Sequence, residues 1–149
     1  MKKFLFFALA LVAGAMAFTA CNGNNPDDKP TSFLNIKFFV DLNRGTTPTS
    51  HYVIFKNDST FEEGWELYSD AERTTLSKRQ FNTGTFQLQP EYMDLYYTAS
   101  YDERNGQLSP VGDYEPWEVR VYYAFDGDTL ALTFNKGTEY EYTDKYWRK

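Results

Sequence analysis

The stretch WEVRVYYAFDGDTLALTF, residues 117–134, decides which fold class the sequence predicts. From Trp117 to Phe125, apolar or aromatic residues occupy every second position, which is the pattern of a β-strand with one buried face. Asp126-Gly127 follows and favours a tight hairpin turn, after which the alternation resumes through residue 134. This part of the chain is therefore predicted to be an antiparallel hairpin.

Similar runs extend from this hairpin toward both ends of the chain. Asn135-Lys136-Gly137 predicts a second turn, and Tyr140, Tyr142 and Trp147 predict a last strand, so that the C-terminal part forms a meander. Upstream, alternating segments predict strands over residues 33–42, 51–56, 61–67, 83–89 and 92–100.

Two positions are expected to be irregular, with a bulge at Gly64 and an edge strand around Leu76. Because sustained 3.6-residue periodicity is missing beyond the N-terminal segment, little helix is expected. The predicted fold is all-β, a small antiparallel meander barrel of eight or nine strands, and the alternative is a β-sandwich.

The N-terminal segment resembles the signal of a bacterial lipoprotein. Lys2-Lys3 precedes a long apolar run, which ends in Thr19-Ala20 followed at once by Cys21, as in a lipobox. The resemblance implies that residues 1–20 are a signal peptide and that Cys21 is the site of lipid attachment, with acyl chains that hold the protein in the membrane. The alternative is an ordinary secretory signal that leaves Cys21 as a free thiol.

The segment after the cysteine indicates where the domain begins. Residues 21–30 comprise the lipidated cysteine and a polar, Gly/Asn/Pro-rich tether, and residues 31–149 form a single domain. Asp27-Asp28 resembles the acidic export signal of surface lipoproteins in Bacteroides-like bacteria. The expected location is the outer membrane, with the domain anchored by lipid and facing either the cell surface, as the acidic pair indicates, or the periplasm.

Charge and cysteine usage exclude several function classes. Without residues 1–20 the chain has 129 residues, 13 of them basic and 21 acidic, giving a net charge near −8. Nucleic acid is excluded as a partner, because binding its phosphates requires clustered Lys and Arg. The single cysteine excludes an intrachain disulfide and a Cys-based zinc site.

Two longer stretches resemble a known family. Residues 53–97 and 125–149 are similar to the lipocalin-like lipoproteins of Bacteroidetes, which have a calycin-type β-barrel. The motifs concerned are Phe55 to Phe61, Gly84-Thr85-Phe86, Gly127 to Leu132 and Trp147-Arg148. The resemblance implies a barrel whose interior holds one small ligand.

Residues for catalysis or metal binding do not form a recognisable motif. His51 is the only histidine and follows Ser50 directly, so their side chains point to opposite faces of a strand, and His51 is expected at the surface or at a strand end. The acid pairs Glu62/Glu66 and Glu139/Glu141 are expected on solvated strand faces. We therefore expect a protein that is not an enzyme and has no cofactor and no metal.

Aromatic residues exceed what an ordinary core requires, since 24 remain after residue 20. The surplus suggests rings that line a cavity or stack on sugar rings, and the alternative is packing in the core and on the surface. The candidate ligand-binding residues are Trp65, Tyr97, Tyr101, Tyr114, Trp117 and Tyr123.

The segment from Tyr101 to Glu115 is predicted to be a long irregular loop that flanks or gates the ligand site. Its acids, Asp102, Glu103, Asp113 and Glu115, would repel anions, so the expected ligand is neutral or cationic. The alternative is a solvated connection without a role in binding.

The function predicted from these features is binding without catalysis. The chain would be a membrane-anchored binding or accessory lipoprotein that holds a small apolar or neutral ligand in its barrel. A glycan-contacting accessory module and a structural subunit of an envelope complex are the alternatives.

Overall fold

The computed structural model describes residues 32–44 and 47–148, so the predicted signal peptide, Cys21 and the tether lie outside the described residues. The described part contains nine β-strands and no helix, hence no helix there that is long and apolar enough to span a membrane. The strands are β1 (Lys37–Arg44), β2 (Thr47–Phe55), β3 (Thr60–Tyr68), β4 (Leu76–Leu88), β5 (Tyr92–Arg104), β6 (Gln107–Pro110), β7 (Trp117–Phe125), β8 (Thr129–Phe134) and β9 (Tyr142–Arg148).

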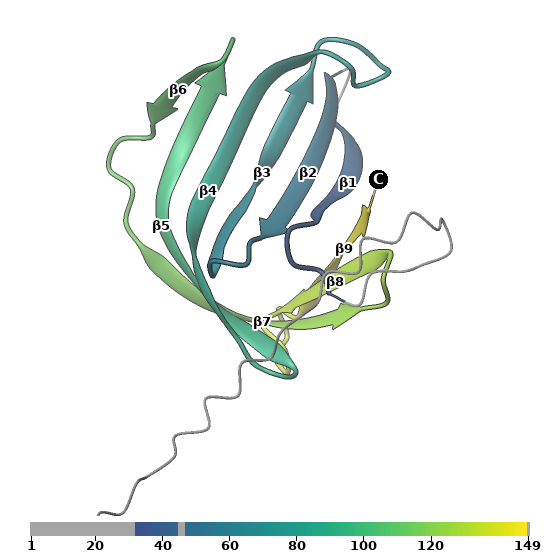
Figure 1. Cartoon of the computed structure of the whole chain (residues 1–149), viewed down its shortest axis with the longest axis vertical. Coiled ribbons are helices and arrows are strands. Elements are labelled where there is room, and N and C mark those ends of the chain that lie inside the picture. The colour runs from purple at the N-terminus through teal and green to yellow at the C-terminus, as the bar shows by residue number, and fades with distance from the viewer. Residues whose placement is uncertain (1–31, 45–46, 149) are drawn as a thin grey trace, which may run out of the picture.

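The strands form a closed antiparallel barrel with up-and-down connections (Figure 1). The order is β4-β3-β2-β1-β9-β8-β7-β5-β6, and pairing of β4 with β5 closes the ring of eight strands. β6 is the extra strand and pairs only with the end of β5. The predicted small barrel is thus confirmed, and the β-sandwich alternative is not the fold of this chain.

The wall of the barrel is much taller on one side than on the other. β4 and β5 each have 13 residues, whereas β8 has only six. β9 contacts β1 through two residue pairs only. The strands β1 to β6, which we call the tall wall, continue past the ends of β7, β8 and β9 (Figure 1). We call the end where β7 begins and β8 ends the open end.

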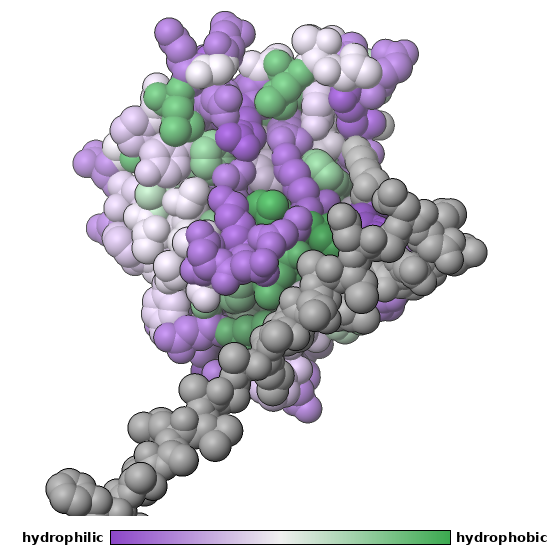
Figure 2. Space-filling model, viewed as in Figure 1, coloured by the Kyte–Doolittle hydropathy of each residue, from purple (hydrophilic) through white to green (hydrophobic). Residues whose placement is uncertain are grey.

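The core fills the opposite, closed end of the barrel. Phe33 packs edge-on against Phe55 and Tyr123 there, with ring centroids 5.6 and 5.3 Å apart. The buried cluster consists of Phe33, Phe38, Val53, Phe55, Phe61, Phe86, Met93, Leu95, Tyr97, Val121, Leu130, Leu132, Phe134 and Tyr146. On the face seen in Figure 2, apolar residues form a few separate patches among mostly polar ones.

The predicted loop from Tyr101 to Glu115 is wrong for its first half. β5 continues to Arg104, and β6 pairs Arg104 with Gln107 and Tyr101 with Pro110. Asn105 and Gly106 have φ angles of 51° and 76°, which are the values of a type I′ hairpin turn. The Asn105-Gly106 pair is the sequence signal for this hairpin. It was missed because the many acids around it favoured the interpretation as an irregular loop.

Three other local predictions also need correction. Gly64 is not a bulge, because it pairs regularly with Tyr52 and Phe81. The glycine is needed for close approach, since a Cβ there would lie 2.3 Å from the carbonyl oxygen of Gln80. Leu76 begins a strand that is paired on both sides, and the first strand starts at Lys37 rather than at residue 33.

Candidate functional site at the open end of the barrel

A cavity of about 410 Å³ lies at the open end, between the tall wall and the ends of the short strands. A second cavity of about 270 Å³ adjoins it and shares His51, Glu63, Trp65 and Asn82 with it. Together they have the size of a pocket for a small ligand, roughly 300–1,000 Å³. The larger cavity is lined by His51, Glu63, Trp65, Asn82, Tyr97, Trp117, Val119, Phe134, Asn135, Tyr142 and Asp144.

A chain of polar contacts crosses the floor of this pocket. The Nε2 atom of His51 lies 3.1 Å from a carboxylate oxygen of Glu63, and its Nδ1 atom lies 3.1 Å from the Tyr146 hydroxyl. The hydroxyl of Tyr97 donates a hydrogen bond to the other carboxylate oxygen of Glu63. These groups come from β2, β3, β5 and β9, so the contacts link both sides of the barrel.

His51 was expected at the surface, and that prediction is wrong. Its residue exposure is only 9%, because position 51 shares the inner face of β2 with Val53 and Phe55. The imidazole also stacks on Trp65 with a centroid distance of 4.2 Å. An imidazole is tolerated on this face because Glu63 and Tyr146 satisfy its two nitrogens.

The tyrosines of the pocket stay neutral. Burial raises the pKa of Tyr97, and the negative charge of Glu63 adds to this effect. The same two causes raise the pKa of Tyr146, to which Asp144 contributes as well. Their hydroxyls therefore remain protonated and can donate hydrogen bonds.

Three stacked ring pairs surround the cavity. His51 and Trp65 form one, Tyr97 and Trp117 form the second at 3.8 Å and 5° between planes, and Phe134 and Tyr142 form the third at 4.9 Å and 9°. Trp117 and Tyr142 are about half exposed at the rim. The pocket thus has aromatic walls whose outermost rings can be reached from solvent.

Asp144 is the second carboxylate in the larger cavity. It shares the inner face of β9 with Tyr142 and the buried Tyr146, because side chains alternate along a strand. Its carboxylate forms no hydrogen bond or ion pair within residues 32–44 and 47–148, although its charge raises the pKa of Tyr142 and Tyr146.

The structure brings together three of the six candidate residues proposed from sequence. Trp65, Tyr97 and Trp117 line the larger cavity, and the Tyr114 hydroxyl accepts a hydrogen bond of 3.0 Å from the indole N–H of Trp117. Tyr101 lies elsewhere, stacked on Phe81 on the outer face.

Tyr123 is also far from the cavity, because it packs at the closed end against Phe33. The sequence reasoning missed His51, Glu63, Tyr142, Asp144 and Tyr146. Strict alternation from Phe61 through Glu63 to Trp65 was the available signal for Glu63. Glu63 was missed because the acids beside it, Glu62 and Glu66, were expected to lie on a solvated face.

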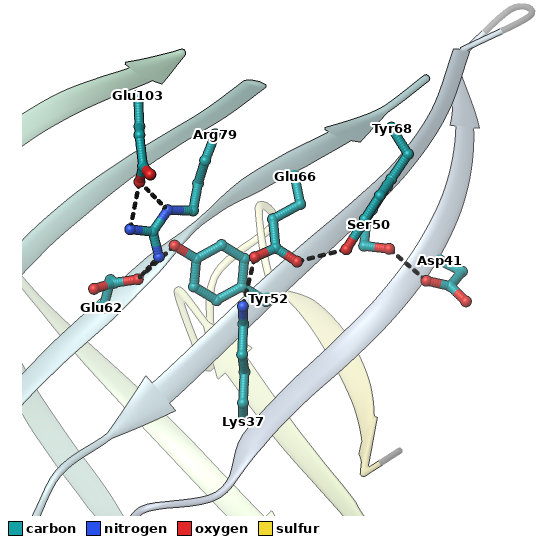
Figure 3. A network of polar contacts seen from close by, with 9 residues as sticks. All are labelled: Lys37, Asp41, Ser50, Tyr52, Glu62, Glu66, Tyr68, Arg79 and Glu103. Atoms are coloured by element: carbon teal, nitrogen blue, oxygen red, sulfur yellow. Dashed lines mark hydrogen bonds and ion pairs between the residues drawn. The ribbon is translucent and has the colours of Figure 1, made fainter. Parts of the chain in front are cut away.

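A separate network of charges covers the outer face of the tall wall (Figure 3). Arg79 donates to Glu62 at 3.0 Å and to Glu103 at 2.7 and 3.0 Å. Lys37 reaches across the ring of Tyr52 to Glu66 at 2.5 Å. The remaining contacts are those from Tyr52 to Glu62, Tyr68 to Glu66 and Ser50 to Asp41.

This network corrects the expectation that Glu62 and Glu66 lie on a solvated face. Glu66 is only 6% exposed. Burial and the hydrogen bond to Glu62 raise the pKa of Tyr52, which is fully buried although it points away from the core. Glu139 and Glu141 are not on a strand, since both precede β9 and Glu141 accepts a hydrogen bond from the Gly137 N–H at 2.6 Å.

Neither cluster has the ligand set of a metal site among the described residues. Within the described ranges there is no group of three or more His, Cys, Asp or Glu side chains that could hold a metal ion. Comparison of the chain with models of known protein families and with curated proteins finds no match.

Proposed function

We propose that this protein is a lipid-anchored binding lipoprotein of the outer membrane that holds a small, water-soluble, neutral or cationic ligand at the open end of its barrel. The single observation that supports the proposal is the cavity of about 410 Å³, in which aromatic walls surround convergent polar groups. Ligand sites often lie in the mouths of β-barrels, where a rigid wall fixes the lining side chains.

The composition of the lining favours a polar ligand over a long apolar one. Side chains of the core fill the closed end, so a fatty chain would have no deep channel to enter. His51, Glu63 and Asn82 instead present polar atoms toward the cavity. The resemblance of the sequence to lipocalin-like lipoproteins likewise implies a barrel that holds one small ligand.

The anchor rests on the sequence Thr19-Ala20-Cys21 after an apolar run. Cys21→Ser should prevent incorporation of a fatty-acid analogue and release the domain from the membrane fraction. If the parent protein incorporates no label and the variant stays in the membrane fraction, the anchor is wrong. Protease treatment of intact cells then separates a surface location from a periplasmic one.

The binding function is tested by thermal unfolding of the purified protein in the presence of single compounds. The panel contains neutral sugars, amines, carboxylates and fatty acids. A ligand that binds only the folded state stabilises it by RT ln(1 + c/Kd), where c is the ligand concentration, so the unfolding temperature rises with the logarithm of c once c exceeds Kd. We expect neutral or cationic polar compounds to do so and fatty acids to have no effect. Stabilisation by fatty acids alone would contradict the proposal.

A further inference from the structure

The open-end pocket has an excess of negative charge that its lining does not balance. Glu63 and Asp144 both line the larger cavity, and neither cavity is lined by a Lys or Arg among the described residues. Lys37 and Arg79 point to the outer face of the wall and are paired there, and Lys78 on β4 is paired with Asp102 at 3.1 Å. A cleft lined by one sign of charge concentrates ligands of the opposite sign.

Glu63 and Asp144 are not equivalent. Both oxygens of Glu63 already have partners, namely His51 and Tyr97. Asp144 has no such partner in the described part of the chain, and it lies beside Tyr142 on the inner face of β9. A carboxylate in a partly enclosed site gains most from a cation that it can approach directly.

The aromatic walls favour one kind of cation. Five rings line the larger cavity, those of Trp65, Tyr97, Trp117, Phe134 and Tyr142. The negative face of an aromatic ring attracts ammonium groups, and the effect is strongest for Trp and in sites with little water. Small metal ions require several oxygen ligands instead, and the described residues offer no such group.

From this arrangement we propose that the ligand of the open-end pocket is an organic ammonium ion, whose charged head lies among the aromatic rings and opposite Asp144. This inference rests on the proposed binding function and names its ligand class. The amide of Asn82 lines both cavities and can orient a polar substituent of the same molecule.

The test compares choline with its uncharged carbon isostere, 3,3-dimethyl-1-butanol, which has the same shape without the charge. The full mature protein is purified in a maltoside detergent, which carries no ammonium group. Binding is followed by calorimetry and by tryptophan fluorescence, because Trp65 and Trp117 line the cavity. We expect choline to bind at least about ten-fold more tightly than the isostere, and more weakly as salt is added.

Two variants locate the effect. Asp144→Asn removes the unpaired charge without a contact to break and should weaken choline binding about ten-fold while leaving binding of the isostere unchanged. Glu91→Gln removes one charge in the β4–β5 turn at the closed end and should change neither. Urea unfolding of both variants verifies that they fold like the parent.

Each remaining outcome overturns the inference. Glucose serves as a neutral sugar probe in the same assay. If glucose or the isostere binds as tightly as choline, or if Asp144→Asn binds choline as well as Glu91→Gln does, the pocket does not select ammonium ions. The proposed binding function would still stand in either case. If none of these probes binds, the ammonium proposal is wrong, and a negative thermal-unfolding panel would then remove the binding function as well.

Discussion

Glu62 and Glu63 are neighbours on β3, yet they belong to two clusters with opposite properties. Glu62 points outward and is held by Arg79 and by the Tyr52 hydroxyl. Glu63 points inward to the pocket, where its partners are the imidazole of His51 and a neutral tyrosine. On the outer face carboxylates meet cations, whereas in the pocket two carboxylates meet aromatic rings and no Lys or Arg among the described residues.

The comparison separates carboxylates that are paired with Lys or Arg in the wall from pocket carboxylates that are not. A buried or half-buried ion pair is costly to break from one side, because the remaining charge is left without compensation. The outer network therefore acts on stability. An acidic pocket without cations gives up some stability of the folded state, and a ligand of opposite charge recovers it.

Alkaline pH should have the largest effect because it acts on both clusters. Burial raises the pKa of Tyr52, Tyr97 and Tyr146 above the ordinary value of 10, so only the unfolded chain ionises them near that pH. The contribution of these tyrosines to the free energy of unfolding is therefore fully present below pH 10 and is lost as the pH rises above it. The slope of this loss approaches about 4 kcal/mol per pH unit for the three tyrosines. Urea unfolding at increasing pH, with tyrosinate absorbance recorded, measures this loss.

Tyr52→Phe and Tyr97→Phe serve as controls, one for each cluster. Each variant should lower the slope of the pH dependence by about 1.4 kcal/mol per pH unit, since each removes one buried tyrosine hydroxyl. If these tyrosines ionise while the barrel is still folded, the hydroxyls are not shielded and the assignment of both clusters is wrong.

Gly64→Ala should have the next largest effect on stability. The substitution lies on β3, which carries Glu62 of the outer network and Glu63 of the pocket. The added Cβ would lie 2.3 Å from the Gln80 carbonyl oxygen and 2.5 Å from the Phe81 Cβ. Because the backbone of β3 or β4 would have to move to relieve this overlap, we expect a loss of about 3 kcal/mol in the free energy of unfolding. Gly112→Ala, where no atom lies within 4 Å, is the matched control and should stay within about 0.5 kcal/mol of the parent. Equal effects of the two would contradict the close packing at Gly64.

The sequence predicted the barrel because its signals are local. The alternation from Trp117 to Phe125 and the Asp126-Gly127 turn each concern a few consecutive residues, and every strand except β6 pairs with the strand that follows it in the chain. Gly64 shows the limit, since its role depends on Phe81, which is 17 positions away. An isolated glycine in a strand gives the same sequence signal for a bulge as for close approach.

The site was harder to predict than the fold for a related reason. Three aromatic candidates meet because they lie on inner faces near the same end of the barrel. Asp144 and Glu63 reach that end from β9 and β3, and register decides their proximity rather than sequence spacing. Tyr101 failed as a candidate because the β4–β5 register shifts at Thr83/Gly84, which reverses the alternation of β5 between Tyr97 and Tyr101 and leaves the Tyr101 ring on the outer face.

Arg79→Met should reduce stability by less than Gly64→Ala does. The variant leaves Glu62 and Glu103 without their shared cation, and the arginine side chain is 25% exposed, so water offsets part of the cost. We expect a loss of about 2 kcal/mol, measured by urea unfolding, with choline binding unchanged. Lys56→Met removes a charge from the β2–β3 connection and is the control. Weaker choline binding in Arg79→Met would show that the outer network and the pocket are not independent.

The smallest change in stability is expected from the pair Glu62→Gln and Glu63→Gln, which also distinguishes the clusters most sharply. Both variants replace one carboxylate by an amide on the same strand, one position apart. Glu62→Gln weakens charge-assisted hydrogen bonds from Arg79 and Tyr52, so it should cost about 1 kcal/mol and leave choline binding unaltered.

Glu63→Gln removes half of the negative charge in the pocket, so it should weaken choline binding several-fold with a smaller loss of stability. Because the amide can still accept from the Tyr97 hydroxyl, the floor of the pocket keeps its geometry and the loss of affinity reports charge alone. The reverse result, with Glu62→Gln reducing binding and Glu63→Gln reducing stability, would mean that the functional face of this wall is the outer one.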